Sequence, residues 1–405
     1  MSAPRLLIVS HDFPPSTGTG GRHAERLARF LAARGAGPAV VTAARGFYGQ
    51  AVLLGPSVRD EVKVFEVPYG RRFAVLQKAG WPGRQLWKVA VVGAYREAIE
   101  RALEAGPRPD FLYFLGVPFW YFPLARRLSA RHGIPYVLDF PDVFYMRGVT
   151  YRMGHRGGLR QLVDKVVEAR AVGGASLVIL STEEQTEFYR RRYSAKAAGD
   201  FITVPWGYDE DAVRAALAGP APLKAPDVFR LVIFGKFAAY GADDASVLAR
   251  AVAGLHARQR VEVLHLGDRE PALAEAFRRE GLSMCLHETG MIAYEEGLRT
   301  AASADCLVLS TISDVSVPVK AYDYIGLNRP VLAFVRRGSA TGRLLSRFPG
   351  AFIAEGSGDA EEALHMISEG GVRQLGPGLD TSEFGQARGF ERLAARLEEL
   401  RGGRS

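Results

Sequence analysis

Short apolar runs recur along the whole chain, and most are followed by a loop and then by a segment with helical spacing. The first run is 6–9, and the helical segment 22–34 after it carries Ala24, Leu27 and Leu31 on one face. Apolar strands that alternate with helices are typical of parallel sheets, because parallel strands need a crossover connection. The pattern therefore predicts an α/β protein.

The chain has 405 residues, of which 48% are hydrophobic and 24% charged, a composition typical of folded proteins. Single hydrophobic cores stop growing near ~250–300 residues, so we expect two domains. The segment 216–226 is rich in Ala, Pro and Gly, as linkers are. We therefore expect one domain at 1–215 and a second at 216–405.

Net charge and hydropathy limit the cellular location and the binding partners that we expect. The sequence has no run of the ~20 apolar residues needed to cross a bilayer, and its first run is too short for a signal peptide, so we expect a cytoplasmic protein. The net charge of +8 fits nucleic acid, an anionic membrane or a phosphate-bearing substrate. The basic residues are scattered, which ranks nucleic acid last, and we expect no nucleic-acid partner. Cys285 and Cys306 lie in apolar surroundings, which indicates buried free thiols.

The segment 306–335 brings together several residues that could bind a ligand. An apolar run at 306–309 precedes a loop with Ser and Pro, then a short helix with Lys320 and Asp323, and then a helix stop at 328–330. Backbone N–H groups at a helix start favour an anion, and Lys320 adds a positive charge there. Asp323 can accept hydrogen bonds from hydroxyls. One site therefore offers contacts for a phosphate and for a ribose or sugar.

This segment resembles the donor-binding segment of the retaining, nucleotide-sugar-dependent glycosyltransferases of family four, which have the two-domain GT-B fold. Many members show there Pro-Ser-Lys, then an acidic residue with an aromatic neighbour, then Gly-x-Pro-Val. The counterparts here are Pro318-Val319-Lys320, Asp323-Tyr324 and Arg329-Pro330-Val331. The resemblance runs through nearly the whole chain. It implies two Rossmann-like α/β domains facing a cleft, with the last helix crossing back onto the first domain.

The resemblance implies further donor contacts. Gly20 and Gly21 match a glycine loop that faces the cleft, although a plain turn is the alternative. The cation of Gly235-Lys236 would meet the diphosphate, with a solvent-exposed lysine as the alternative, and the turn at 290–296 would pair with the nucleobase. Tyr240 stands where members commonly have a second lysine. The expected donor-binding residues are Gly20, Gly21, Gly235, Lys236, Met291, Ile292, Val317, Pro318, Lys320 and Asp323.

Three aspartates are candidate catalytic residues. Asp139 and Asp142 end an apolar strand, and ligands of open α/β sheets bind beyond the carboxyl ends of strands. Close carboxylates can hold sugar hydroxyls or act as a base. The alternative is a helix N-cap with a salt bridge to Arg147. The third candidate is Asp314, beside Val315. Val315 occupies the place where many members carry the first of two glutamates with seven residues between them.

The resemblance implies a hexosyltransferase that moves a sugar from a nucleotide sugar to an acceptor hydroxyl with retained configuration, without a metal or other cofactor. The departing diphosphate needs cationic and backbone donors, for which Lys236 and Lys320 are the candidates. The acceptor is a small molecule or a lipid-linked glycan. One alternative is a silent nucleotide-binding relative that acts as a partner subunit, which Val315 and Tyr240 favour. Another is a pseudo-glycosyl coupling enzyme of the same fold.

The region 71–88 is basic and aromatic, and in the family this part meets the acceptor and often the membrane. Such a surface can rest on anionic lipid at the inner face of the membrane. The alternative is a loop and a helix whose aromatic residues belong to the core. The residues concerned are Arg71, Arg72, Phe73, Lys78, Trp81, Arg84, Trp87 and Lys88.

Overall fold

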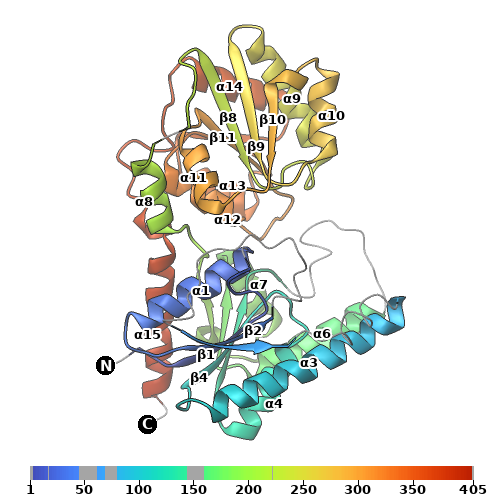
Figure 1. The fold of residues 1–405 in the computed structure, drawn as a ribbon, viewed down its shortest axis with the longest axis vertical. Coiled ribbons are helices and arrows are strands. Elements are labelled where there is room, and N and C mark those ends of the chain that lie inside the picture. The colour runs from blue at the N-terminus through green and yellow to red at the C-terminus, as the bar shows by residue number, and fades with distance from the viewer. Residues whose placement is uncertain are drawn as a thin grey trace. The chain divides into compact units, whose positions relative to one another are not determined.

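A computed structural model describes residues 3–16, 18–44, 62–68, 80–143, 159–220 and 222–403. The described chain divides into two compact units (Figure 1). Unit 1 ends at Val204 and resumes at Gly389, and unit 2 spans Pro205–Arg388 between them. The division thus precedes the expected boundary at 215/216, which falls inside a helix of unit 2, α8 (Glu210–Ala218).

Unit 1 is built on a seven-stranded sheet with the order β3-β2-β1-β4-β5-β6-β7, and its strand pairs are parallel. The order reverses between β1 and β4, where the loops leaving the two strands diverge. Strands β1, β4 and β5 are buried along their whole length, which explains their continuous apolar runs. The strands are β1 (Leu6–Ser10), β2 (Ala39–Ala43), β3 (Lys63–Val67), β4 (Phe111–Leu115), β5 (Tyr136–Phe140), β6 (Leu177–Leu180) and β7 (Phe201–Thr203).

Helices cover this sheet: α1 packs on β1, α3 on β2 and β3, α4 on β4 and β5, and α7 on β6 and β7. The start of α7 shows how local sequence decides a helix end. The Thr182 hydroxyl accepts the N–H of Gln185, and the Gln185 side chain accepts the N–H of Ser181. The helices are α1 (Thr19–Ala32), α3 (Gly80–Glu104), α4 (Phe122–His132), α6 (Leu159–Gly174) and α7 (Glu183–Arg192).

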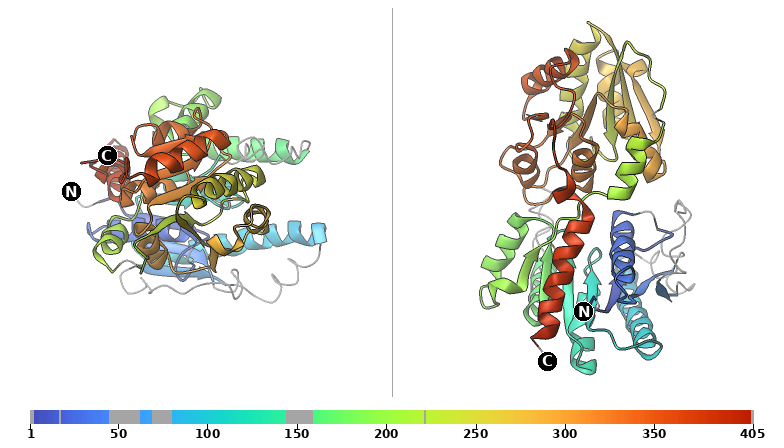
Figure 2. Two further views of the ribbon diagram at one scale, coloured as in Figure 1. Left: turned by 90° about the horizontal axis from the view of Figure 1, so that it is seen from above. Right: turned by 90° about the vertical axis from the view of Figure 1, so that its left-hand side faces the viewer.

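The last helix, α15 (Gln386–Gly402), returns to unit 1, where Figure 2 shows it in red beside the blue α1. Phe390 packs against His23 and Phe30, with ring centroids 5.3 and 5.5 Å apart. Near its other end, Arg401 forms an ion pair with Asp110 at 3.4 Å. The first domain is therefore completed by the end of the chain.

Unit 2 repeats the architecture with a six-stranded parallel sheet of order β10-β9-β8-β11-β12-β13. Its order reverses between β8 and β11. The strands are β8 (Val228–Phe234), β9 (Arg260–Leu266), β10 (Leu286–Gly290), β11 (Cys306–Ser310), β12 (Val331–Phe334) and β13 (Ala351–Ala354). The further helices are α9 (Ala242–His256), α10 (Pro271–Arg279), α11 (Tyr294–Ala302), α12 (Val319–Leu327), α13 (Ala340–Leu345) and α14 (Ser357–Ser368).

The two faces of this sheet carry separate cores. Leu231 and Ile233 pack with α9, α10 and α14, whereas Val232 between them packs with α8, α11 and α12. Both faces are covered, and β11 and β12 are buried along their whole length, which explains their apolar runs. Cys285 and Cys306 are free and buried, as predicted. The predicted α/β class with two parallel-sheet domains is confirmed.

Two segments of unit 2 run side by side where the chain enters and leaves it. Tyr208 donates its N–H to Phe384 O at 3.1 Å, and Gln386 donates its N–H to Tyr208 O at 3.0 Å. Gly207, directly before Tyr208, has a φ of +58°. A Cβ on this residue would lie 2.7 Å from the backbone of Gly385 in the other segment. Only glycine fits both the conformation and the space.

Candidate functional site

The carboxyl ends of β8 and β11 form the switch point of unit 2, where open α/β sheets bind ligands. The chain leaves β8 through Gly235, whose φ is +76°, and continues into Lys236. After β11 the chain turns at Pro318 into α12, whose second residue is Lys320. The first N–H groups of a helix have no partner within it, so this end of α12 offers donors. Asn328 ends the helix in the left-handed conformation, with φ of 51°.

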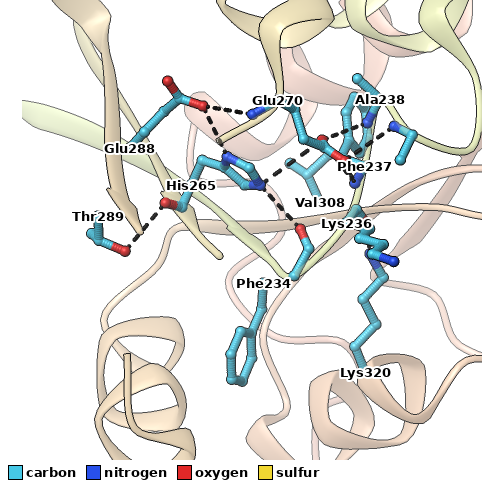
Figure 3. A network of polar contacts seen from close by, with 12 residues as sticks. Phe234, Lys236, Phe237, Ala238, His265, Glu270, Glu288, Thr289, Val308 and Lys320 are labelled. Carbon is cyan, nitrogen blue, oxygen red and sulfur yellow. Dashed lines mark hydrogen bonds and ion pairs between the residues drawn. The ribbon is translucent and has the colours of Figure 1, made fainter. Parts of the chain in front are cut away.

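Two predicted lysines meet at this point (Figure 3). The Lys320 ammonium donates a hydrogen bond to the backbone carbonyl of Lys236 at 2.5 Å. Burial lowers the pKa of Lys320 to about 8, and the charge of Glu270 opposes this shift. Lys236 is exposed, and no contact within the described chain occupies its ammonium group. One lysine therefore ties the loop to α12, and the other is available to an anion.

The loop after β8 is also held from the other side. The Glu270 carboxylate accepts the N–H groups of Phe237, Ala238 and Ala239 at 2.7–3.1 Å. Tyr324 of α12 accepts the N–H of Phe234 at 3.0 Å. Sequence reasoning missed Glu270, because its partners lie more than thirty residues upstream.

Asp323 is 2% exposed and accepts a hydrogen bond from the Tyr294 hydroxyl at 2.7 Å. The ring of Tyr294 stacks on that of Phe234, with centroids 6.0 Å apart. The candidate ribose-binding carboxylate is therefore held by a hydrogen bond from Tyr294, a residue that the sequence analysis did not single out. An aromatic residue at the first position of α11 was the available signal.

Two more carboxylates lie at the exits of the strands. Asp314, in the loop after β11, forms an ion pair with Arg336, and its carbonyl accepts the N–H of Ala340 at 2.8 Å. Asp244, in the first turn of α9, accepts a hydrogen bond from Ser310 at 2.6 Å. Burial raises the pKa of Asp244, and this hydrogen bond opposes the shift. The sequence analysis did not name Asp244.

The remaining candidates of unit 2 lie near its strand ends and helix starts. Met291 follows β10 and is 60% exposed. Ile292 and Val317 are partly buried and pack against the core on the α11 and α12 side of the sheet. Met291 is therefore the more accessible of the two residues expected at the nucleobase.

The donor-binding candidates of unit 1, Gly20 and Gly21, do not lie in a loop as expected. Helix α1 begins at Thr19, so Gly20 and Gly21 lie in its first turn and not in the loop before it. A Cβ on Gly21 would lie 3.0 Å from Ser16 O, so a close backbone approach accounts for that glycine.

Asp139 is 2% exposed, accepts a hydrogen bond from the Tyr113 hydroxyl and lies 3.7 Å from His23 Nε2. This placement in the core favours a structural role for Asp139. Asp142 is half-buried after β5. Its alternative partner Arg147 lies outside the described residues.

His11 and Asp12 follow β1 at the switch point of unit 1, and the sequence analysis missed both. Burial lowers the pKa of His11 to about 4 and raises that of Asp12 to about 6. His11 Nδ1 lies 2.9 Å from the Tyr95 hydroxyl, and its ring meets the edge of Trp120.

The expected membrane surface lies mostly outside the described residues, which omit 69–79. Within them, Trp87 packs edge-on against Trp120 with centroids 6.2 Å apart. No helix in the described ranges is long and apolar enough to cross a membrane. The described residues also contain no group of three His, Cys, Asp or Glu side chains that could hold a metal ion.

Residues 18–207 match the family model of the glycosyl transferase 4-like domain. The match covers most of unit 1 and none of the lysine site of unit 2. No curated protein matches the chain by sequence.

Solved structures resemble the chain over nearly its whole length. WaaG, a glycosyltransferase involved in lipopolysaccharide biosynthesis, has 16% identity and a TM-score of 0.63, covering 98% of both chains. Anabaena Alr3699/HepE in complex with UDP and glucose has 14% identity and a TM-score of 0.60, also covering 98% of both. UDP-GlcNAc 2-epimerase from Methanocaldococcus jannaschii has 14% identity and a TM-score of 0.57, covering 98% of this chain and 99% of the other.

The chain has the GT-B fold, as the sequence resemblance predicted.

Proposed function

We propose that the chain transfers a sugar from a nucleotide sugar to an acceptor hydroxyl with retained configuration. The observation that carries this proposal is the meeting of Lys236 and Lys320 at the carboxyl ends of β8 and β11. The bond between the anomeric carbon and the diphosphate breaks, and negative charge develops on the diphosphate. Cations aimed at that charge favour the transition state. The exposed Lys236 ammonium is the group that meets it.

The proposal needs no metal ion, because the lysine side chains and the first N–H groups of α12 supply the positive charge. Asp323, supported by Tyr294, is the candidate partner of the ribose hydroxyls. Met291 is the accessible candidate at the nucleobase. A uridine diphosphate sugar is the first donor to test, since HepE, which shares the fold, binds UDP and glucose.

The acceptor is a small molecule or a lipid-linked glycan, and unit 1 is its proposed binding side. Asp142 and Asp12 lie at strand ends there, and each is partly accessible. Burial raises the pKa of Asp12 to about 6, so its carboxylate is suited to accept a proton near neutral pH. Asp12 is therefore a stronger candidate base than the buried Asp139.

A thermal-shift panel of UDP-, GDP-, ADP- and TDP-sugars tests the donor site. A ligand at 100 times its dissociation constant stabilises by about 2.7 kcal/mol, enough to move a melting point visibly. We expect one nucleotide to stabilise the wild type, Lys236→Ala to lose the shift and Arg250→Ala, exposed on α9, to keep it. Absence of a shift with every nucleotide contradicts the proposal.

A second candidate is a nucleotide-binding relative with no transfer activity. It is favoured by Val315 at the usual glutamate position and by the ion pair that engages Asp314 with Arg336. A third reaction, suggested by the shared fold of the epimerase, changes the sugar on the same donor. Product analysis by NMR separates glycoside formation from sugar epimerisation and from an unchanged donor.

A further inference from the structure

The backbone after β8 forms an anion-binding concavity that is already occupied. The Glu270 carboxylate accepts the N–H of Phe237 at 3.0 and 3.1 Å, of Ala238 at 2.7 Å and of Ala239 at 3.1 Å. Successive N–H groups that converge in this way form a nest, which in many proteins binds phosphate. Here the occupant belongs to the same chain and is 8% exposed. Three N–H donors thus converge on this one carboxylate.

His265 lies beside Glu270 and is 0% exposed (Figure 3). Its Nδ1 lies 3.4 Å from Glu288 Oε1. Its Nε2 lies 3.1 Å from Gly235 O and 3.9 Å from Glu270 Oε2. Glu288 Oε1 also accepts the backbone N–H of Glu270 at 3.1 Å.

The hydrogen-bond partners of the two ring nitrogens indicate the charge of His265. A carbonyl oxygen and an ionised carboxylate only accept hydrogen bonds. Both ring nitrogens of His265 face such acceptors, so each needs a hydrogen. A neutral ring would point one lone pair at an acceptor in a buried site, which is costly. Lys320 is a further charged group that interacts with this cluster, through Glu270.

We propose that Glu288, His265 and Glu270 form a charged triad that positions the 235–239 loop for diphosphate binding, with His265 held as an imidazolium. The role of the diphosphate rests on the proposed function. The triad holds the carbonyl of Gly235 and the N–H groups of 237–239, while Lys320 holds the carbonyl of Lys236. The nest is filled, so the diphosphate meets the Lys236 side chain and not the loop amides.

The charge of His265 is tested first, without any nucleotide. Ring-nitrogen NMR of the full chain between about pH 6 and pH 9 reports whether both nitrogens carry hydrogen. We expect both ring nitrogens of His265 to carry hydrogen, with Glu288→Gln or Glu270→Gln shifting its signals. His287, exposed on the neighbouring strand, serves as a reference histidine, and His265→Gln provides the assignment. A neutral His265 tautomer at about pH 7.5 overturns the proposal.

The positioning role is tested by calorimetry with UDP, GDP, ADP and TDP. We expect Glu270→Gln to weaken the best-bound nucleotide by about tenfold or more, because a charged acceptor of three N–H groups is lost. Glu275→Gln, on α10 and partly exposed, is the matched control and should bind as wild type. Unchanged binding overturns the proposal, and so does tighter binding, which would identify Glu270 as a competitor of the diphosphate.

A second variant, Glu288→Gln, tests the positioning role even if Glu270→Gln does not fold. Glu288→Gln keeps the acceptor of the Glu270 N–H but removes the charge facing His265. It should weaken the same nucleotide by a smaller factor, with a normal unfolding transition. If no nucleotide binds the wild type, the proposed function fails, whereas the NMR result still decides the charge state of the triad.

Discussion

The Lys320 ammonium donates a hydrogen bond to the backbone carbonyl of Lys236, 84 residues earlier in the chain. This contact joins the exit of β8 to the first turn of α12 at the switch point of the sheet. It gives two lysines of one site different tasks. Lys320 holds the backbone of the loop, and Lys236 keeps its side chain for a ligand.

Lys320→Met should therefore loosen the loop, whereas Lys236→Met should leave it unchanged. The first variant loses the hydrogen bond to Lys236 O, so the N–H groups of 237–239 should exchange faster with solvent. The second removes only an exposed ammonium. Amide hydrogen exchange measured on both variants checks this. Equal exchange in the two would show that the tie has no structural effect.

Nucleotide affinity should fall as the pH rises through about 8, where the Lys320 ammonium loses its proton. A bound diphosphate favours the charged form, so its affinity is greatest below this pKa and declines by at most tenfold per pH unit above it. Calorimetry at a series of pH values measures the decline. Lys320→Met removes the titrating group and should show a flat profile over the same range.

Gly207→Ala should destabilise unit 2 by about 1–3 kcal/mol or more, because the φ of +58° and the 2.7 Å approach to Gly385 both oppose a side chain. The matched control is Gly254→Ala in α9, where a Cβ meets nothing within 4 Å. That change should stabilise by about 0.5–1 kcal/mol, since alanine favours a helix. Denaturant unfolding of both variants gives the comparison. A mild effect of Gly207→Ala would contradict the packing described.

Asp12→Asn should raise the melting temperature at neutral pH and have little effect near pH 4. Burial raises the pKa of Asp12 from 3.8 to about 6, so the folded chain keeps this proton longer than the unfolded chain. Stability therefore falls as the pH rises from about 4 to about 6, and the cost is complete above that range. Thermal unfolding at several pH values measures it. Asp268→Asn, at an exposed position, is the control.

Local sequence determined the secondary elements and the class of fold. The apolar run of β11, the Thr182 cap of α7 and the Asn328 stop of α12 depend on side chains within a few residues of one another. Repetition of this pattern in both halves indicated parallel sheets, and the free cysteines followed from their apolar neighbours.

Tertiary structure alone decided which of these side chains meet. The strand order places β9 and β11 on either side of β8, so Glu270 and Lys320 reach one loop from different parts of the chain. The same packing covers Asp139 with Tyr113 and His23. Short-range periodicity records which face of an element is buried. Short-range periodicity does not predict strand order, because that order results from the packing of all elements together.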